Sequence, residues 1–348
     1  MKRFGLKVGA ILMMNASLVA CGGGGGGGND GGSAAVGSGS GSGSPTISAP
    51  YSAISQTNYP AAAAAGAGPF TSLTDLSGSF DALTTGVEVS TPSISLANVS
   101  ATIYLRFGRE TPQFVTGAVR TVACSGGGTL VIADSTSSND NLSAGDRGSF
   151  TANNCVEGDL GRLNGTVSFT VTSVAGDPAT SDRYSLGLAA EYSNFTIASG
   201  TDSITVNGDL SLLIRQNGSN NVDVNATGNT LSLVATESGA NRAARLTSYS
   251  LTGTEINGVS SFSGNYTLSG STAQLGDFTY RIETSSPVVQ SSSSTYPSSG
   301  TMVIHGSPAS VTVNALNSGM VRLDYSAAGD GTISASRTLS WSEFEALQ

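Results

Sequence analysis

The sequence predicts an all-β protein built on a large, mainly antiparallel sheet, and three observations support this. From about Val87 onward, short runs of residues alternate between polar and apolar side chains. Turn signals separate the runs, and no long amphipathic helix interrupts them. Such spacing is typical of antiparallel sheets. Two closures fit the pattern: a sandwich or strongly curved sheet with a dry core, or an open or closed barrel with a cavity.

The clearest strand signal is "TVSFTVT", Thr166 to Thr172, in which every second residue is apolar. Val167, Phe169 and Val171 would therefore face a core, because alternate residues of a strand share one face. Similar runs are "SITV" (203–206), "DLSLLI" (209–214), "TLSLVA" (230–235), "YTLSG" (266–270), "FTYRIE" (278–283), "TMVIHG" (301–306), "SVTVNAL" (310–316) and "VRLDYS" (321–326).

Hairpin turns are predicted at the Asn-Gly pairs, because both residues tolerate positive φ. These pairs lie at 164–165, 207–208, 217–218 and 257–258, and Asp330-Gly331 is a further candidate.

Helices are expected only at the two ends of this strand region. A short helical turn is predicted around Ala61–Ala65 or Leu73–Leu83. At the C-terminal end, Ser340 and Glu343 have the spacing of a capping box, which predicts a helix of barely two turns. We expect Trp341 in this helix to plug one end of the sheet.

The first twenty residues have the order of a bacterial secretion signal: a basic start, a short apolar run and small residues. The ending "LVAC", Leu18 to Cys21, resembles the lipobox of bacterial lipoproteins. That resemblance implies cleavage after residue 20 and lipidation of Cys21, whereas the alternative is a plain cleaved signal with a chance cysteine. Since Gly22 replaces the Asp that retains lipoproteins at the inner membrane, the resemblance favours the outer membrane.

Residues 21–48 are predicted to be a flexible Gly- and Ser-rich tether, because they contain too few apolar residues to form a core. The root-mean-square span of its stretch from Gly22 to Ser44 would be roughly 25 Å. Residues 49–348 then form the β-rich domain, whose subdivision stays open.

The charge balance restricts the partners of the mature chain. After residue 20 there is no lysine, and 12 arginines face 24 acidic residues, a net charge of −12. An acidic chain without a basic stripe argues against nucleic acid as a partner. The expected partners are the membrane, through the lipid anchor, and an envelope protein or glycan.

Two cysteines remain after Cys21, and in an exported protein Cys124 and Cys155 would form a disulfide. Two buried free thiols are the alternative. A disulfide here would close a loop of about thirty residues, worth roughly 3–4 kcal/mol in the chain-entropy model.

The segment around these cysteines is "ACSGGGTLVIADSTSSNDNLSAGDRGSFTANNCVEGDLGRLNGTVSFTV". It resembles a family of uncharacterised, β-rich exported bacterial proteins that share the Cys before Gly-Gly, the Leu-Ser-x-Gly-Asp loop end and the Cys after Asn-Asn. The chain from "YPSSGTMVIHG" to "VRLDYSAAGDGTISASRTLSWSEF" resembles the same family's C-terminal end. The resemblance covers Cys124 to Gln348 and implies the β fold and the disulfide, but no activity.

Catalytic chemistry is restricted by missing residue types. The mature chain has one histidine, His305, and no lysine, which argues against histidine-rich zinc sites, Ser-Lys dyads and Schiff-base chemistry. A Ser-His-Asp triad would need His305, yet no G-x-S-x-G elbow occurs outside the tether. We expect a structural histidine.

No metal or other cofactor is predicted. The loop Asp134 to Asp146 has the length of a calcium loop, but serines replace two of its early carboxylates and its glycine is missing. A solvated hairpin loop is therefore expected, and Asp324 to Thr332 is interpreted as a hairpin turn. The calcium-loop positions are occupied by Ser135, Ser137, Asn139, Asp140 and Asp146.

Together these features predict a lipid-anchored envelope protein that acts as a binding or scaffolding module. One alternative is a carrier of an apolar ligand in a β cavity. Another is a hydrolase of envelope polysaccharide that uses two carboxylates in one cleft.

Overall fold

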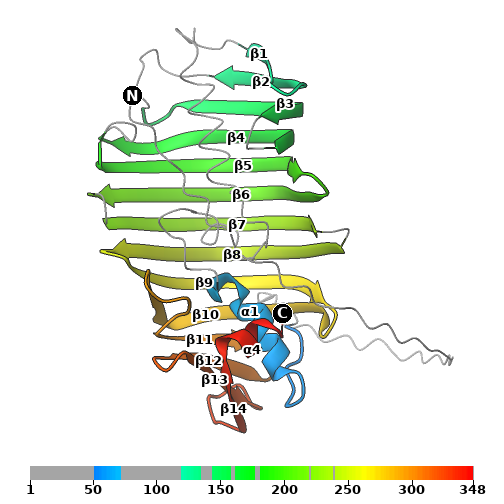
Figure 1. The fold of residues 1–348 in the computed structure, drawn as a ribbon, viewed down its shortest axis with the longest axis vertical. Coiled ribbons are helices and arrows are strands. Elements are labelled where there is room, and N and C mark those ends of the chain that lie inside the picture. The colour runs from blue at the N-terminus through cyan, green and yellow to red at the C-terminus, as the bar shows by residue number, and fades with distance from the viewer. Residues whose placement is uncertain are drawn as a thin grey trace, which may run out of the picture. The chain divides into compact units, whose positions relative to one another are not determined.

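The computed structural model describes residues 51–71, 119–134, 143–157, 161–176, 181–218, 221–237 and 240–347. Within these residues, fourteen strands form one antiparallel sheet in which each strand pairs with the next along the chain (Figure 1). The first and last strands do not pair with each other, so the sheet is open. The predicted all-β, antiparallel fold is confirmed, as a single open sheet and not as a closed barrel.

The strands of the sheet lengthen toward its middle and shorten again. They are β1 (Val119–Ala123), β2 (Thr129–Asp134), β3 (Arg147–Glu157), β4 (Gly161–Ala175), β5 (Arg183–Ser199), β6 (Asp202–Asn217), β7 (Asn221–Glu237), β8 (Ala240–Ile256), β9 (Val259–Thr272), β10 (Gly276–Ser291), β11 (Ser299–His305), β12 (Ser310–Leu316), β13 (Met320–Ser326) and β14 (Ala335–Ser340).

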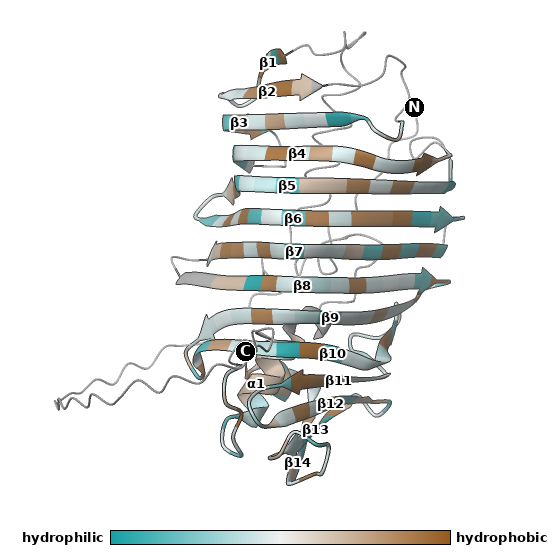
Figure 2. Ribbon diagram, turned by 180° about the vertical axis from the view of Figure 1, so that it is seen from behind, coloured by the Kyte–Doolittle hydropathy of each residue, from teal (hydrophilic) through white to brown (hydrophobic). Residues whose placement is uncertain are grey.

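One face of the sheet is apolar and buried, and the opposite face, called here the polar face, carries mainly Ser, Thr, Asn and charged residues. Figure 2 shows the alternation of hydropathy along the strands. On β4, Val167 and Val171 are buried as predicted, and Phe169 is partly buried against the same core. The side-chain period of two therefore sets which residues enter the core.

The strands are longer than the sequence runs because bulges replace some of the predicted turns. The runs 203–206 and 209–214 were expected in separate strands, but both belong to β6. Asn207-Gly208 lies between them in mid-strand, and Asn164-Gly165 lies within β4. The prediction of hairpins at these two pairs is therefore wrong.

The other Asn-Gly pairs do lie at strand ends. Asn257 and Gly258 both have positive φ, 52° and 77°, and they join β8 to β9 as a two-residue turn. Asn217-Gly218 lies where β6 ends, and Asp330-Gly331 lies in the connection from β13 to β14.

A line of backbone irregularities, called here the bulge line, crosses neighbouring strands from β3 to β7. Two strands of this line contain an Asn with positive φ: Asn154 on β3 and Asn194 on β5. The N–H of Asn154 donates to Oδ1 of Asn164 at 2.8 Å, and that of Asn194 donates to Oδ1 of Asn207 at 2.7 Å. In each case the acceptor is the Asn of an Asn-Gly pair on the next strand.

The glycine of each pair makes room for a carbonyl group on the strand that follows. A Cβ atom on Gly165 would lie 2.1 Å from the carbonyl oxygen of Asn194. A Cβ atom on Gly208 would lie 2.0 Å from that of Thr230. Any side chain at these positions would displace the neighbouring strand, which explains why each pair is Asn followed by Gly.

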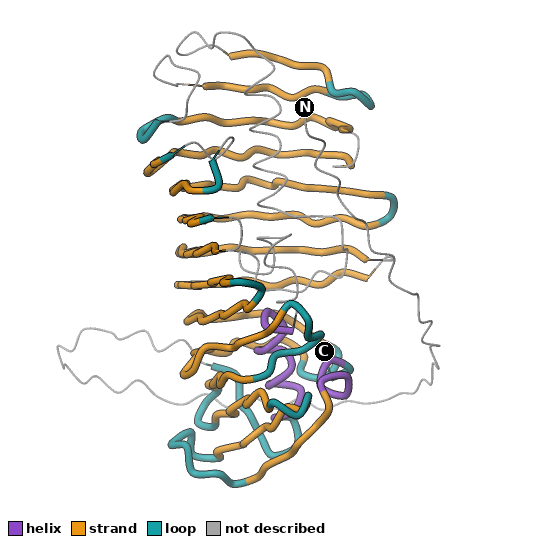
Figure 3. Tube along the Cα trace, turned by 60° about the vertical axis from the view of Figure 1, so that its left-hand side comes forward, coloured by secondary structure: helices purple, strands orange, loops and turns teal. Residues whose placement is uncertain are grey.

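Two helices lie at the C-terminal end of the sheet (Figure 3). Helix α1 (Tyr59–Thr71) includes the predicted turn around Ala61–Ala65 and contacts β10 to β13, whereas 73–83 lies outside the described residues. Its Ala62, Ala63 and Ala64 are fully buried. Gly66 allows close contact with Ile304 on β11, because a Cβ atom there would lie 2.5 Å from Cγ1 of Ile304.

Helix α4 (Trp341–Glu345) is the predicted C-terminal helix, with both hydrogen bonds of its capping box. The Glu343 N–H donates to Oγ of Ser340 at 3.2 Å, and the Ser340 N–H donates to Oε2 of Glu343 at 2.8 Å. Trp341 is buried and stacks on Tyr296, with ring centroids 5.9 Å apart. Its expected position as a core residue is confirmed.

Replacing Gly165 with Ala tests the bulge line. Gly165→Ala should lower the free energy of unfolding by about 3 kcal/mol or more, because it adds a clash with Asn194 to the cost of a positive φ. Gly331→Ala is the matched control: its φ of 84° is close to the 90° of Gly165, but a Cβ atom there meets nothing within 4 Å. We expect the control to lose only about 1 kcal/mol. Urea denaturation followed by Trp341 fluorescence measures both, and equal losses would contradict the close approach of β4 and β5.

Candidate functional site

Cys124 and Cys155 form a disulfide, with their Cα atoms 5.4 Å apart, so the predicted bond is confirmed. It joins the residue after β1 to a residue near the C-terminal end of β3. Glu157 lies beside it, buried, and accepts hydrogen bonds from the N–H of Ser125 at 2.7 Å and from its hydroxyl at 3.0 Å. Cys124, Cys155 and Glu157 lie close enough together to resemble a set of metal ligands. Because both sulfur atoms are in the disulfide, the group instead links the end of β1 to β3.

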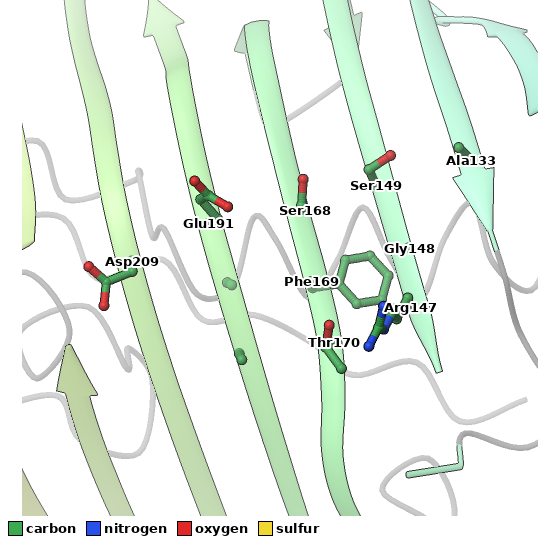
Figure 4. A pocket seen from close by; sticks show the side chains of 11 residues that line it. Ala133, Arg147, Gly148, Ser149, Ser168, Phe169, Thr170, Glu191 and Asp209 are labelled. Atoms are coloured by element: carbon green, nitrogen blue, oxygen red, sulfur yellow. The ribbon is translucent and has the colours of Figure 1, made fainter. Parts of the chain in front are cut away.

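A hollow of about 570 Å³, called here the polar trough, opens across β2 to β6 (Figure 4). Most of its side chains stand on the polar face. The residues that line it are Ala133, Arg147, Gly148, Ser149, Ser168, Phe169, Thr170, Ala189, Ala190, Glu191 and Asp209.

Strand register places five of these residues in a single row across the sheet. Ser149 pairs with Ala133 on one side and with Ser168 on the other. Glu191 likewise pairs with Ser168 and with Asp209. Directly opposite residues in an antiparallel sheet point to the same face, so these side chains share one surface.

The trough is hollow because its floor is made of small residues. Ala133 and Ala189 carry only a methyl group on the polar face, whereas Arg147 and Glu191 are exposed, longer side chains. Gly148 alternates with Ser149 and accommodates Phe169 on the apolar side, since a Cβ atom there would lie 2.4 Å from Cζ of the ring. Phe169 packs against the apolar core, so the missing side chain of Gly148 is required by the packing of β3 and β4.

Asp209 ends the row and is held by the bulge line. Its Oδ2 accepts a hydrogen bond from the N–H of Asn229 at 2.8 Å, and its Oδ1 accepts one from the N–H of Thr230 at 2.9 Å. Its own carbonyl accepts the hydroxyl of Tyr249. Figure 4 shows the carboxylate turned away from Glu191. Asp209 is thus a structural carboxylate at the margin of the trough.

Tyr249 supports Asp209 from the apolar face. Burial raises the pKa of the Tyr249 hydroxyl, and coulombic interactions with Asp209 and with Tyr192 raise it further. The hydroxyl therefore stays protonated at neutral pH and can donate to the Asp209 carbonyl. Gly228 gives it space, because a Cβ atom at Gly228 would lie 2.4 Å from the Tyr249 hydroxyl oxygen.

The middle of the row offers polar groups to solvent. Ser168 and Glu191 are exposed, and Ser149 is partly exposed. Within the described part of the chain, no hydrogen bond or ion pair engages the side chains of these three residues. The row therefore presents two hydroxyls and one carboxylate, each able to take a partner from outside the protein.

His305, the one histidine of the mature chain, lies opposite Arg281 on β10. Its Nε2 atom lies 3.7 Å from Oε2 of Glu283. Burial and the charge of Arg281 lower the His305 pKa, and Glu283 raises it by a smaller amount. His305 is therefore neutral at pH 7 and stands on a strand beside an exposed Arg–Glu pair, away from the polar trough.

The two acidic segments considered from the sequence have different roles. β2 ends at Asp134 and its antiparallel neighbour β3 begins at Arg147; residues 135–142 between them lie outside the described residues, so the solvated loop stays a prediction. Asp146 is buried at its end, and its Oδ2 accepts the N–H of Ser143 at 2.8 Å.

The interpretation of Asp324 as a turn residue is wrong. It lies within β13, is buried, and accepts hydrogen bonds from Asn314, Arg322 and Ser336 at 2.7–3.0 Å. Asp330 does lie in the turn, where the N–H and hydroxyl of Thr332 lower the pKa of its carboxyl.

Residues 1–50, with Cys21 and the expected tether, lie outside the described residues, so lipidation of Cys21 stays a prediction. None of the helices in the described ranges has the length and apolar character needed to cross a membrane. Comparison with known proteins gives no match to a family model, to a curated protein or to a solved structure. The site therefore has to be interpreted from its own geometry.

Replacing Asp209 tests its structural role. Asp209→Ala should lower the free energy of unfolding by about 2 kcal/mol, because two backbone N–H groups lose their acceptor. Asp209→Asn keeps one acceptor oxygen and should lose less. Glu191→Ala, the exposed cross-strand neighbour, is the control and should stay within about 0.5 kcal/mol of the wild type in urea denaturation. An Asp209→Ala variant as stable as Glu191→Ala would show that the carboxylate does not hold the bulge.

Proposed function

We propose that this chain is an exported, lipid-anchored protein of the bacterial cell envelope that acts as a binding module. Its anchor is Cys21, its expected location is the outer membrane, and its binding surface is the polar trough. The lipobox-like "LVAC" supports the anchor. The disulfide is typical of proteins in oxidising compartments and supports export.

The observation that carries the binding role is the register of the trough. Ser149, Ser168 and Glu191 come from three neighbouring strands, and the pairing of those strands fixes their relative positions. Groups held on rigid strands lose little freedom when a ligand binds. A broad sheet with such a row can bind a polar envelope component without any moving part.

A carboxylate-based hydrolase is the second candidate, because Glu191 and Asp209 stand directly opposite each other in the trough. Opposite residues place their Cβ atoms about 5 Å apart, which is within reach of a paired-carboxylate mechanism. However, both oxygens of Asp209 accept backbone N–H groups of β7, and its carboxylate turns away from Glu191. This geometry favours binding over hydrolysis.

The alternative function, a carrier of an apolar ligand, has less support than a binding module for a polar partner. Most of the large apolar side chains of the sheet are buried, and the trough opens on the polar face. A polar partner, protein or glycan, fits hydroxyls and a carboxylate better than an apolar ligand does.

Replacing Cys21 tests the anchor. Cys21→Ser should move the protein from the membrane fraction to the soluble fraction and abolish incorporation of labelled fatty acid, since the thiol is the site of lipidation. Gly22→Ser, which keeps the cysteine, is the control and should stay in the membrane fraction. Unchanged partitioning of Cys21→Ser would rule out the lipoprotein assignment.

Cross-linking in intact cells tests the binding role. A photo-reactive side chain at position 168, in the trough, should trap an envelope component. The same group at position 250, an exposed site of β8 on the polar face, is the control and should trap much less. If position 168 traps nothing above position 250, the trough is not a binding surface.

A further inference from the structure

We propose that the polar trough binds a linear glycan without acidic groups, laid across the strands so that successive sugars lie over successive strands. The inference rests on the proposed function, since it concerns the same surface, and it specifies the class of partner. The spacing of the row, its chemistry and its charge support it.

The spacing of the row suits a polymer with a short repeat. Ser149, Ser168 and Glu191 occupy directly paired positions on β3, β4 and β5. Neighbouring strands are about 4.8 Å apart, so the row presents one polar group at each such step. An extended chain of pyranose sugars advances by a similar length per residue. A glycan running across the strands would therefore meet a new polar group with each sugar.

The three groups have the chemistry to bind sugar hydroxyls. A serine hydroxyl both donates and accepts, and a carboxylate accepts through two oxygens, so Glu191 can receive two neighbouring hydroxyls of one sugar. Hydrogen bonds to a charged acceptor are stronger than those between neutral groups. Within the described residues none of the three side chains has a competing partner, so a glycan displaces only water.

The floor of the trough permits a sugar ring to lie close to the sheet. Ala133 and Ala189 carry only methyl groups and leave the space above the backbone open. The trough is also open to solvent, so a long chain can pass through without its ends being enclosed. These features suit a polymer segment better than a small molecule, which is usually bound in an enclosed pocket.

Charge selects against acidic glycans. Glu191 is exposed in the row, and Asp209 follows it on β6. Two carboxylates, Glu191 and Asp209, face one arginine, Arg147, among the lining residues, so the trough is net negative and disfavours a uronate or phosphate group. Neutral sugars and N-acetylated amino sugars meet no such penalty.

The test is a calorimetric titration of the full-length protein in detergent with N-acetylglucosamine oligomers of one to six sugars. Affinity should rise roughly tenfold from one sugar to three or four and then level off. The rise corresponds to a net gain of about one charge-assisted hydrogen bond. The double variant Ser168→Ala/Glu191→Ala should lose at least tenfold, whereas Ser250→Ala should bind as the wild type does. Both altered residues are exposed, and unchanged urea denaturation would show that the double variant is folded.

Neutral glucose oligomers and acidic galacturonate oligomers complete the design. Level affinity from one sugar to six, binding unaffected by the double variant, or tighter binding of the acidic oligomers would each overturn the inference. Failure of every oligomer to bind would also overturn it. If position 168 then traps a protein in cells, the proposed binding function stands without the glycan; if it traps nothing, both fail.

Discussion

The sheet depends on a contact between a backbone carbonyl and a glycine, repeated where the strands bulge. Gly165 faces the carbonyl of Asn194, and Gly208 faces that of Thr230, each at a distance that excludes a side chain. The Asn before each glycine accepts a backbone N–H from the preceding strand. Because the irregular residues keep hydrogen-bonded partners, the strands continue past the bulges and β4 to β8 reach 15 to 17 residues.

The polar trough lies next to this line and shares a residue with it. Asp209 accepts the N–H groups of Asn229 and Thr230 and also ends the row that begins at Ala133. The backbone N–H groups of the bulge on β7 donate to the Asp209 carboxylate on β6, and these hydrogen bonds hold that side chain in place. The same hydrogen bonds that continue the sheet therefore fix one end of the candidate binding surface, while Ser168 and Glu191 stay exposed beside it.

The C-terminal part of the sheet is stabilised differently, by helices of small and aromatic residues. The alanines of α1 allow close approach to the apolar face, and the hydroxyl of Tyr266 donates to the carbonyl of Gly66 at 3.2 Å. Burial raises the pKa of Tyr266, so this hydroxyl remains a donor at neutral pH. At the other end of the sheet, the disulfide joins β1 to β3. The described sheet is thus stabilised by helix packing at one end and by a covalent bond near the other.

Local sequence predicted the β class and the alternation of buried and exposed residues, the disulfide between Cys124 and Cys155, and the cap of α4. Alternation and capping depend on residue type and short spacing, and only two cysteines follow Cys21. Local sequence could not determine whether Asn164-Gly165 and Asn207-Gly208 were turns or bulges, because the carbonyl that each glycine accommodates belongs to another strand. Nor could it place Ser149, Ser168, Glu191 and Asp209 in one row, or assign three donors to Asp324. These contacts depend on which strands pair and in what register, and only the tertiary structure decides that, because cross-strand hydrogen bonds join residues far apart in the chain.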